Sequence, residues 1–231
     1  MWTRAELKNN AKIVLTQNYW KSVLAAFLLI IVGGGAQGNN SSNFFRNADV
    51  SVSGGYGLFY ITEIFAKLGI ILGLVMISFI ITLAVSLFLL NPLEIGCRRY
   101  FISARLAPGD LSLIGFGFKH SYMNIVITQF LRGLFVFLWS LLLIIPGIIK
   151  YYEYRMMPFI LAENPGLDTK SVFAKSKEMM TGNKWNAFVL DLSFIGWHFL
   201  GIFTCGLLNI FYSFPYQQST NAELYEALRS K

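Results

Sequence analysis

The chain has 231 residues, of which 55% are hydrophobic and only 13% are charged, and its mean hydropathy is +0.54. A soluble domain carries about a quarter charged residues, so this composition excludes an ordinary soluble protein. The net charge of +7 could indicate a nucleic-acid partner, but the placement of the basic residues along the chain argues against one.

The chain opens with a basic segment in which Leu7 and Ala11 recur at helical spacing beside Lys8 and Lys12. Helices of this kind commonly lie at a membrane interface, with the apolar face down and the basic face toward lipid headgroups. Packing of the same helix against a bundle is the alternative. A polar elbow follows, and then a first apolar run.

Six apolar segments are candidate spans, because about 20 apolar residues cross the bilayer core of about 30 Å. They cover residues 20–35, 63–90, 122–145, 147–161, 185–203 and 207–216. The last two hairpins are short, so four full spans with re-entrant halves are the alternative. The polar segment 37–62 is expected to be an outer loop.

The pattern of basic helix, elbow and apolar hairpin occurs three times, in pseudo-repeats 5–105, 111–164 and 168–228. The hairpins end at Pro92, Pro158 and Pro215. The sequence therefore predicts an all-α polytopic membrane protein. We expect one membrane domain over residues 1–231, built as a six-helix bundle from three units of an interfacial helix and a transmembrane hairpin.

Basic residues cluster before the first span and after the second: Arg4, Lys8, Lys12, Lys21, Arg98, Arg99, Arg105 and Lys119. The segment between these spans holds a single Arg46. This asymmetry follows the positive-inside rule and predicts that both termini are cytoplasmic. Membrane lipids, above all the anionic inner leaflet, are the expected partners. The candidate headgroup contacts are Lys8, Lys12, Arg98, Arg99 and Lys175.

Ionisable residues inside spans cost about 2.5–3.5 kcal/mol each and usually face the protein interior or a wet cavity. This chain has Arg132, Lys150, Glu153, Arg155 and Asp191. At about 1.5 Å per residue, all except Lys150 could meet in one layer, with Lys150 nearer the outside.

One interpretation of this layer is an anion-accepting cavity with Tyr151 and Tyr154 as hydrogen-bonding walls. The other is a structural ion-pair network, which the nearly balanced charges favour. The spacing of Glu94 and Arg98 also predicts a helical salt bridge.

The sequence lacks the common motifs of hydrolases, nucleotide-binding proteins and metalloproteases. His198 shares a helix face with Asp191, but one histidine and one carboxylate are far short of a metal-ligand set. We therefore expect no enzymatic activity, no metal and no cofactor.

Several segments resemble one known family: residues 4–8, 17–20, 144–148, 157–165 and 192–197. They resemble the bacterial integral membrane proteins catalogued as domain of unknown function 975. The resemblance covers nearly the whole chain except the segment 37–62. More distantly, the layout is similar to the membrane domain that accompanies some glycerophosphodiester phosphodiesterases. The resemblance implies a bacterial plasma-membrane protein without an assigned activity.

Two functions remain open. The first is a non-enzymatic membrane protein that binds or moves a lipid or small amphiphile. The second is an interaction, immunity or regulatory protein that acts through its outer loop or its cytoplasmic amphipathic helices. A cavity at Arg132, Arg155 or Asp191 would favour the first function, and a closed, ion-paired bundle would favour the second. The sequence leaves the oligomeric state open.

Overall fold

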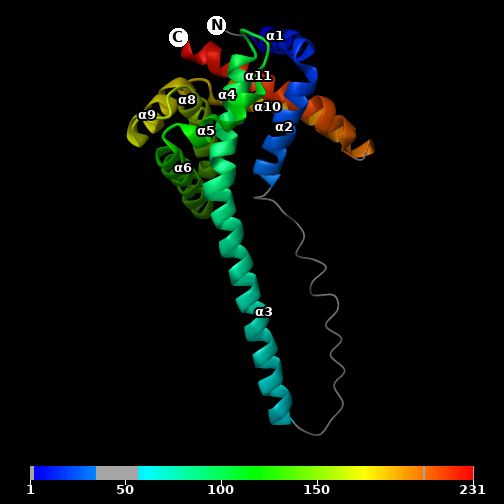
Figure 1. Ribbon diagram of the computed structural model, residues 1–231, viewed down its shortest axis with the longest axis vertical. Coiled ribbons are helices and arrows are strands. Elements are labelled where there is room, and N and C mark those ends of the chain that lie inside the picture. Colours follow the sequence, from blue (N-terminus) through cyan, green and yellow to red (C-terminus); the bar gives the residue numbers. More distant parts are fainter. Residues whose placement is uncertain (1–2, 35–56, 205, 231) are drawn as a thin grey trace.

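A computed structural model describes residues 3–34, 57–204 and 206–230 of the chain, and within these ranges the protein is all-helical (Figure 1). Three described helices are long and apolar enough to cross a membrane: Ile64–Ser103, Tyr122–Leu142 and Lys184–Phe203. The all-helical membrane class is thus supported. The six-helix bundle is not confirmed.

The elements in chain order are α1 (Arg4–Gln17), α2 (Tyr19–Gly34), α3 (Gly57–Val85), the π-helix η2 (Ser86–Leu90), α4 (Asn91–Ser103), the 3₁₀-helix η3 (Leu111–Gly115), α5 (Phe116–Lys119), α6 (Tyr122–Leu142), α7 (Ile144–Glu153), α8 (Met157–Glu163), α9 (Thr169–Met180), α10 (Lys184–Phe203), the π-helix η4 (Asn209–Ser213) and α11 (Phe214–Arg229). The predicted outer loop, residues 37–62, can be compared with the structure only in part, because residues 37–56 lie outside the described residues. Its last six residues differ from the prediction, because α3 already begins at Gly57.

The hydrophobic core lies at one end of the molecule, where α1, α4, α8, α9 and α11 gather (Figure 1). We call these five helices the helical core. Its largest fully buried side chains include Tyr100 and Phe101 of α4, Phe159 of α8 and Tyr225 of α11. Each of these helices also carries at least one charged residue, and the exposed ones include Lys12 of α1 and Lys175 of α9.

The three prolines that end the predicted hairpins occupy equivalent positions. Pro92, Pro158 and Pro215 each lie in the first turn of a core helix, namely α4, α8 and α11. Proline lacks an N–H and displaces the carbonyl one turn earlier, so it is tolerated at a helix start. The π-helices η2 and η4 directly precede two of these helices, where a widened turn relieves that clash.

The predicted elbows are breaks between helices. Asn18 separates α1 from α2, and its Oδ1 accepts a 2.8 Å hydrogen bond from the Gly109 N–H. Gly182 lies between α9 and α10 with φ of +76°, a left-handed conformation that glycine adopts without strain. Ser121, with φ of +45°, precedes α6. Each elbow therefore redirects the chain from the core into an apolar helix.

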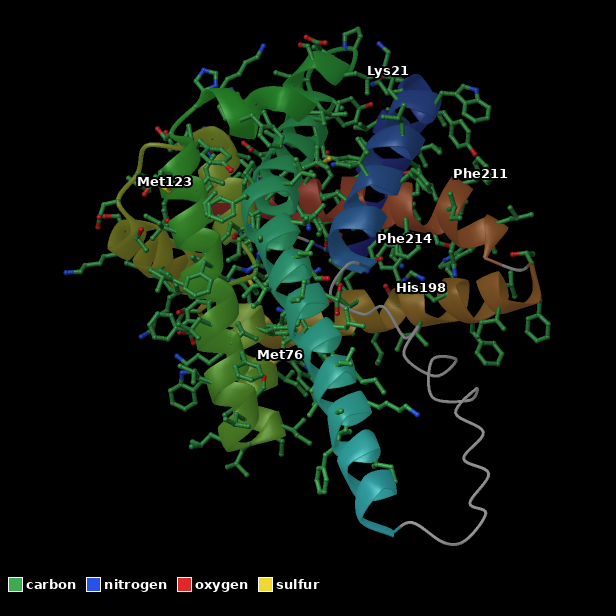
Figure 2. The ribbon with its side chains drawn as sticks, turned by 60° about the horizontal axis from the view of Figure 1, so that its bottom comes forward. Lys21, Met76, Met123, His198, Phe211 and Phe214 are labelled. Carbon is green, nitrogen blue, oxygen red and sulfur yellow. The ribbon has the colours of Figure 1, made fainter. Side chains whose placement is uncertain are left out.

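The helix α10 leaves the core in a different direction from α3 and α6, and the outer part of α3 extends far beyond the other helices (Figures 1 and 2). Met76 of α3 lies well away from Met123 of α6 and His198 of α10 (Figure 2). Two of the six expected spans also differ from the prediction. A turn divides the segment 147–161 into α7 and α8, and the segment 207–216 consists of η4 and the start of α11. Both pieces are shorter than a bilayer crossing requires.

Candidate functional site

Charged residues gather where the apolar helices join the helical core, and they form three clusters. The first cluster connects α4, α6 and α11. Glu94 accepts hydrogen bonds from Arg98 Nη2 at 3.2 Å and from Gln129 Nε2 at 3.0 Å. Arg132 Nη1 lies 3.8 Å from Glu94 Oε2, and Arg98 also donates to Gln218 of α11. The predicted Glu94–Arg98 salt bridge is thus confirmed.

The second cluster connects α10 to the turn after α7 and to α11. Arg155 donates to both carboxylate oxygens of Asp191, at 2.5 and 2.7 Å, in the bidentate geometry that arginine favours. The Tyr152 hydroxyl donates to Asp191 Oδ2 at 2.9 Å, and Arg155 Nη2 donates to Asn221 Oδ1 at 2.7 Å. Only 10% of the Arg155 side chain is exposed. Both charges therefore have well-placed partners.

The third cluster holds a carboxylate between two lysines. Glu153 Oε1 lies 2.8 Å from Lys150 Nζ, and Glu153 Oε2 lies 2.6 Å from Lys184 Nζ. The backbone carbonyl of Glu153 also accepts a hydrogen bond from Ser176 of α9. Lys150 Nζ lies 5.4 Å from the centroid of the Trp139 ring in α6, within cation–π range. This cluster ties α7 to the start of α10.

The predicted intramembrane residues thus fall into more than one cluster. Arg155 meets Asp191, and Lys150 meets Glu153. Arg132 pairs instead with Glu94, a residue that the sequence links only to Arg98. Lys150, expected nearer the outside, shares a cluster with Glu153. Of the two predicted tyrosine walls, Tyr154 borders Lys150 and Tyr151 is exposed.

Several polar partners in the clusters were not predicted from the sequence: Gln129, Tyr152, Lys184, Gln218 and Asn221. Gln129 lies one helical turn before Arg132, so its spacing could have indicated it. Gln218 and Asn221 belong to α11 and reach the clusters only through the tertiary fold. No local spacing could have indicated them.

The candidate headgroup contacts differ in whether other residues hold their side chains. Arg98 is held by Glu94, and Arg99 donates to the Ala162 carbonyl at 3.1 Å. Lys8 Nζ lies 4.5 Å from the centroid of the Phe194 ring, and burial together with the charges of neighbouring cations lowers the pKa of Lys8. Lys12 and Lys175 are exposed. These two lysines are therefore the best placed to contact lipid.

The arrangement of charges is suited to fastening helices. In each cluster the carboxylate is matched by at least one cation and further hydrogen-bond donors, as a buried charge requires. Within residues 3–34, 57–204 and 206–230, no group of three or more His, Cys, Asp or Glu could hold a metal ion. The contacts therefore match the ion-pair interpretation more closely than an open anion site.

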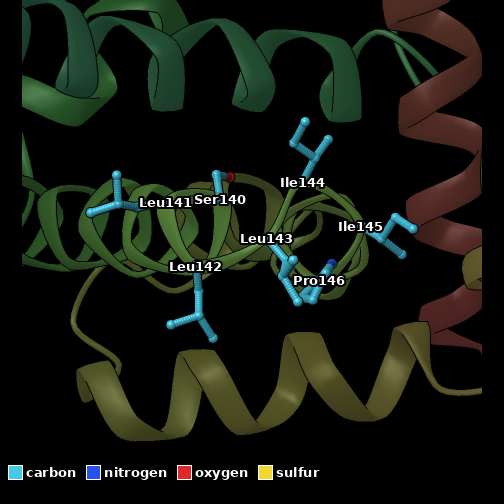
Figure 3. Close-up of a pocket in the computed structure, with 7 residues that line it drawn as sticks. All are labelled: Ser140, Leu141, Leu142, Leu143, Ile144, Ile145 and Pro146. Carbon is cyan, nitrogen blue, oxygen red and sulfur yellow. The ribbon is translucent and has the colours of Figure 1, made fainter.

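The described pocket lies away from these clusters, at the tip of the α6–α7 hairpin (Figure 3). It is an open hollow of about 580 Å³, lined by Ser140, Leu141, Leu142, Leu143, Ile144, Ile145 and Pro146. Its walls are almost entirely apolar. Such a surface suits acyl chains better than a charged ligand.

Comparison with known proteins identifies a family. The model of the family described as protein of unknown function (DUF975) matches residues 46–231, which is most of the chain. No curated protein and no solved structure matches. The more distant similarity to the membrane domain of glycerophosphodiester phosphodiesterases is not shown.

Proposed function

Since this chain belongs to the DUF975 family, whose function is unknown, we propose a function for it from its structure: a non-enzymatic integral membrane protein that binds lipids between helices diverging from one core. It lies in the bacterial plasma membrane with both termini in the cytoplasm. Each of the three pseudo-repeats contributes a core helix and an apolar element.

The divergence of the apolar helices is the observation that supports this proposal. In α3, Ile70 and Phe79 point to opposite sides and are 64% and 62% exposed. A helix that is apolar all round needs lipid or protein around it. The helices α6 and α10 also expose large side chains, including Phe137 and Phe199. Acyl chains would fill the space between these helices.

The exposed lysines support contact with headgroups. Lys12 of α1 and Lys175 of α9 are exposed on the two helices that precede apolar helices α2 and α10. A lysine near an anionic bilayer surface contributes about 1 kcal/mol of attraction. The two lysines would therefore favour anionic over zwitterionic lipid.

A lipid titration tests the proposal. In detergent, added phosphatidylcholine should raise the melting temperature of the protein, and added phosphatidylglycerol should raise it further. The variant Lys12→Glu/Lys175→Glu should lose only the extra increase. Lys12→Arg/Lys175→Arg, which keeps both charges, should behave like the parent. A melting temperature that responds to neither lipid would contradict lipid binding.

The alternative is an interaction or regulatory protein. The closed ion pairs of the three clusters support it, since they offer no open charged site. It would act through the segment 37–62, which lies largely outside the described residues, or through α1 and α9. Full function after replacement of residues 37–56 by a glycine-serine linker of equal length would count against the first of these routes.

A further inference from the structure

We infer that the hairpins α6–α7 and α10–η4 enter only the leaflet adjacent to the helical core, whereas α3 crosses the whole bilayer. This inference rests on the proposed lipid contact and names the lipids involved, namely the acyl chains of the core-side leaflet. It follows from the apolar length of each element beyond its nearest charged residue.

The α3 rod is long enough for a complete crossing. No charged residue lies between Lys67 and Glu94, and the 26 residues between them form a continuous helix through η2 into α4. At 1.5 Å per residue this stretch is about 39 Å long. It exceeds the bilayer core of about 30 Å and leaves room for tilt.

The α6–α7 hairpin is shorter. The buried residues of α6, such as Ile125 and Gln129, all precede Arg132, so the first half of the helix belongs with the core. Beyond Arg132, about ten residues reach the end of α6 at Leu142, a rise of about 15 Å. On the returning arm, Lys150 lies only about 9 Å from the start of α7. The hairpin therefore reaches about the bilayer midplane at most.

The α10–η4 hairpin has a similar limit. About twelve residues separate Asp191 from the end of α10 at Phe203, a rise of about 18 Å. The hydroxyl of Tyr19, the first residue of α2, donates to the Phe211 carbonyl at 3.0 Å. The turn at Thr204 is only about seven residues from Phe211, a rise of about 10 Å along a helix, so the returning arm is short as well. Tilt would reduce the depth of either hairpin further.

The tips of both hairpins suit an apolar environment. Leu142 and Ile144 at one tip are 70% and 76% exposed, and Phe203 at the other is 76% exposed. Protein groups at the far interface would instead include polar residues and a tyrosine or tryptophan belt. Large aliphatic and phenyl side chains at both tips are better accommodated among acyl chains.

In the turn after α10, four backbone N–H groups of the described residues have hydrogen-bond acceptors, as hydrocarbon requires. The N–H groups of Thr204 and Gly206 both donate to the Gly201 carbonyl, at 3.2 and 2.8 Å. The N–H of Leu207 donates to the Thr204 carbonyl, and the N–H of Leu208 donates to the Thr204 hydroxyl. This turn can therefore lie in a membrane interior without leaving these donors unpaired.

Depth-dependent quenching tests the inference on the full-length protein. Cys97 is buried and is kept, Cys205 is replaced by serine, and a fluorescent label is attached to Leu142→Cys or to Phe203→Cys. Each variant is reconstituted in phosphatidylcholine brominated either near the chain ends or near the glycerol. We expect the strongest quenching of Leu142→Cys from bromine near the chain ends, and little quenching of either label by aqueous iodide.

Leu106→Cys serves as the matched control, because Leu106 lies in the loop after α4 and is 87% exposed. Its label should be quenched by iodide and not by brominated chains. If an impermeant thiol reagent labels Leu142→Cys or Phe203→Cys from the side opposite Leu106→Cys, the hairpins cross the bilayer and the inference is wrong. Lipid-dependent melting would survive that outcome, so the two proposals fail separately.

Unequal occupation of the leaflets has a second measurable consequence. Two hairpins in one leaflet displace more area there, so the protein should prefer membranes whose core-side leaflet is convex, as one-sided insertions generally do. In mixed small and large vesicles, an impermeant dye added outside to Leu106→Cys marks only molecules with the core outward. We expect a higher density of these molecules per unit area on the small vesicles. Equal densities would contradict the half-depth arrangement.

Discussion

Replacement of Asp191 by alanine is expected to lower the free energy of unfolding by about 3–5 kcal/mol, because it leaves the largely buried Arg155 guanidinium without its counter-charge. The Asp191 carboxylate receives two hydrogen bonds from Arg155 and one from the Tyr152 hydroxyl. All three donors lose this acceptor at once. The variant should melt at a much lower temperature in detergent and yield less monodisperse protein on size-exclusion chromatography.

A double variant separates the charge effect from lost packing. Arg155→Met/Asp191→Leu replaces the pair with apolar side chains of similar size and should recover much of the lost stability, as apolar replacements of buried ion pairs often do. The matched surface control is Glu226→Ala, because the Glu226 side chain is 33% exposed and its partners Arg105 and Arg229 each keep a second carboxylate, Glu223 and Glu163. That change should cost at most about 1 kcal/mol. An Asp191→Ala protein as stable as the parent would show that the cluster does not fasten α10.

The sequence was most informative about local features. The four-residue spacing of Glu94 and Arg98 correctly predicted their salt bridge, and the elbow at Asn18 marks a real helix break. Both depend on residues within about one helical turn. Apolar length likewise identified α3 and the main part of α6. These features follow from short-range geometry and hydropathy, which a single sequence contains.

The sequence could not predict which charged residues form ion pairs with one another. Depth counted along each span placed Arg132 and Asp191 in one layer, but Arg132 joins Glu94 of α4 and Asp191 joins Arg155. The choice depends on where α11 lies, since Gln218 and Asn221 complete two of the clusters. The position of α11 is a property of the folded core. Residue spacing within a span does not encode it.

Hydropathy alone also cannot show how much of an apolar helix faces lipid. Hydropathy assigns all of α6 to the membrane, although Ile125 and Thr128 in its first half are fully buried in contact with the core. An apolar residue has the same hydropathy whether lipid or protein covers it. The available membrane length of a helix is therefore known only once its packed portion has been subtracted.

Replacement of Gly96 by alanine is the second change expected to have a large effect. Gly96 lies in the middle of α4, and a Cβ there would overlap the backbone carbonyl of Ile114 in η3. A backbone carbonyl cannot rotate away as a side chain can, so α4 and η3 would have to separate. We expect a loss of about 1–3 kcal/mol, and more for Gly96→Val, despite the better helix propensity of alanine.

This close contact determines how the helix that continues α3 packs against the segment that leads into α6. Gly117 of α5 makes the reciprocal approach, since a Cβ there would overlap the carbonyl of Pro92 at the start of α4. The two glycines thus hold the η3–α5 segment, which leads directly into α6, against the helix that continues α3. Gly96→Ala should therefore also loosen the first charged cluster. Faster hydrogen exchange at the amides around Gln129 would report that loosening.

Gly115→Ala is the matched control, because Gly115 has φ of −77° and no heavy atom lies within 4 Å of a Cβ built on it. Its melting temperature should stay within a few degrees of the parent, since a change of about 1 kcal/mol moves the melting temperature of a protein this size by only about 2–4 °C. If Gly96→Ala melts no lower than Gly115→Ala, α4 and η3 are not in direct backbone contact. The angle between α3 and α6 must then be set by other contacts, such as the bonds from Gln129 and Arg132 to Glu94 and from Tyr122 to the Phe88 carbonyl.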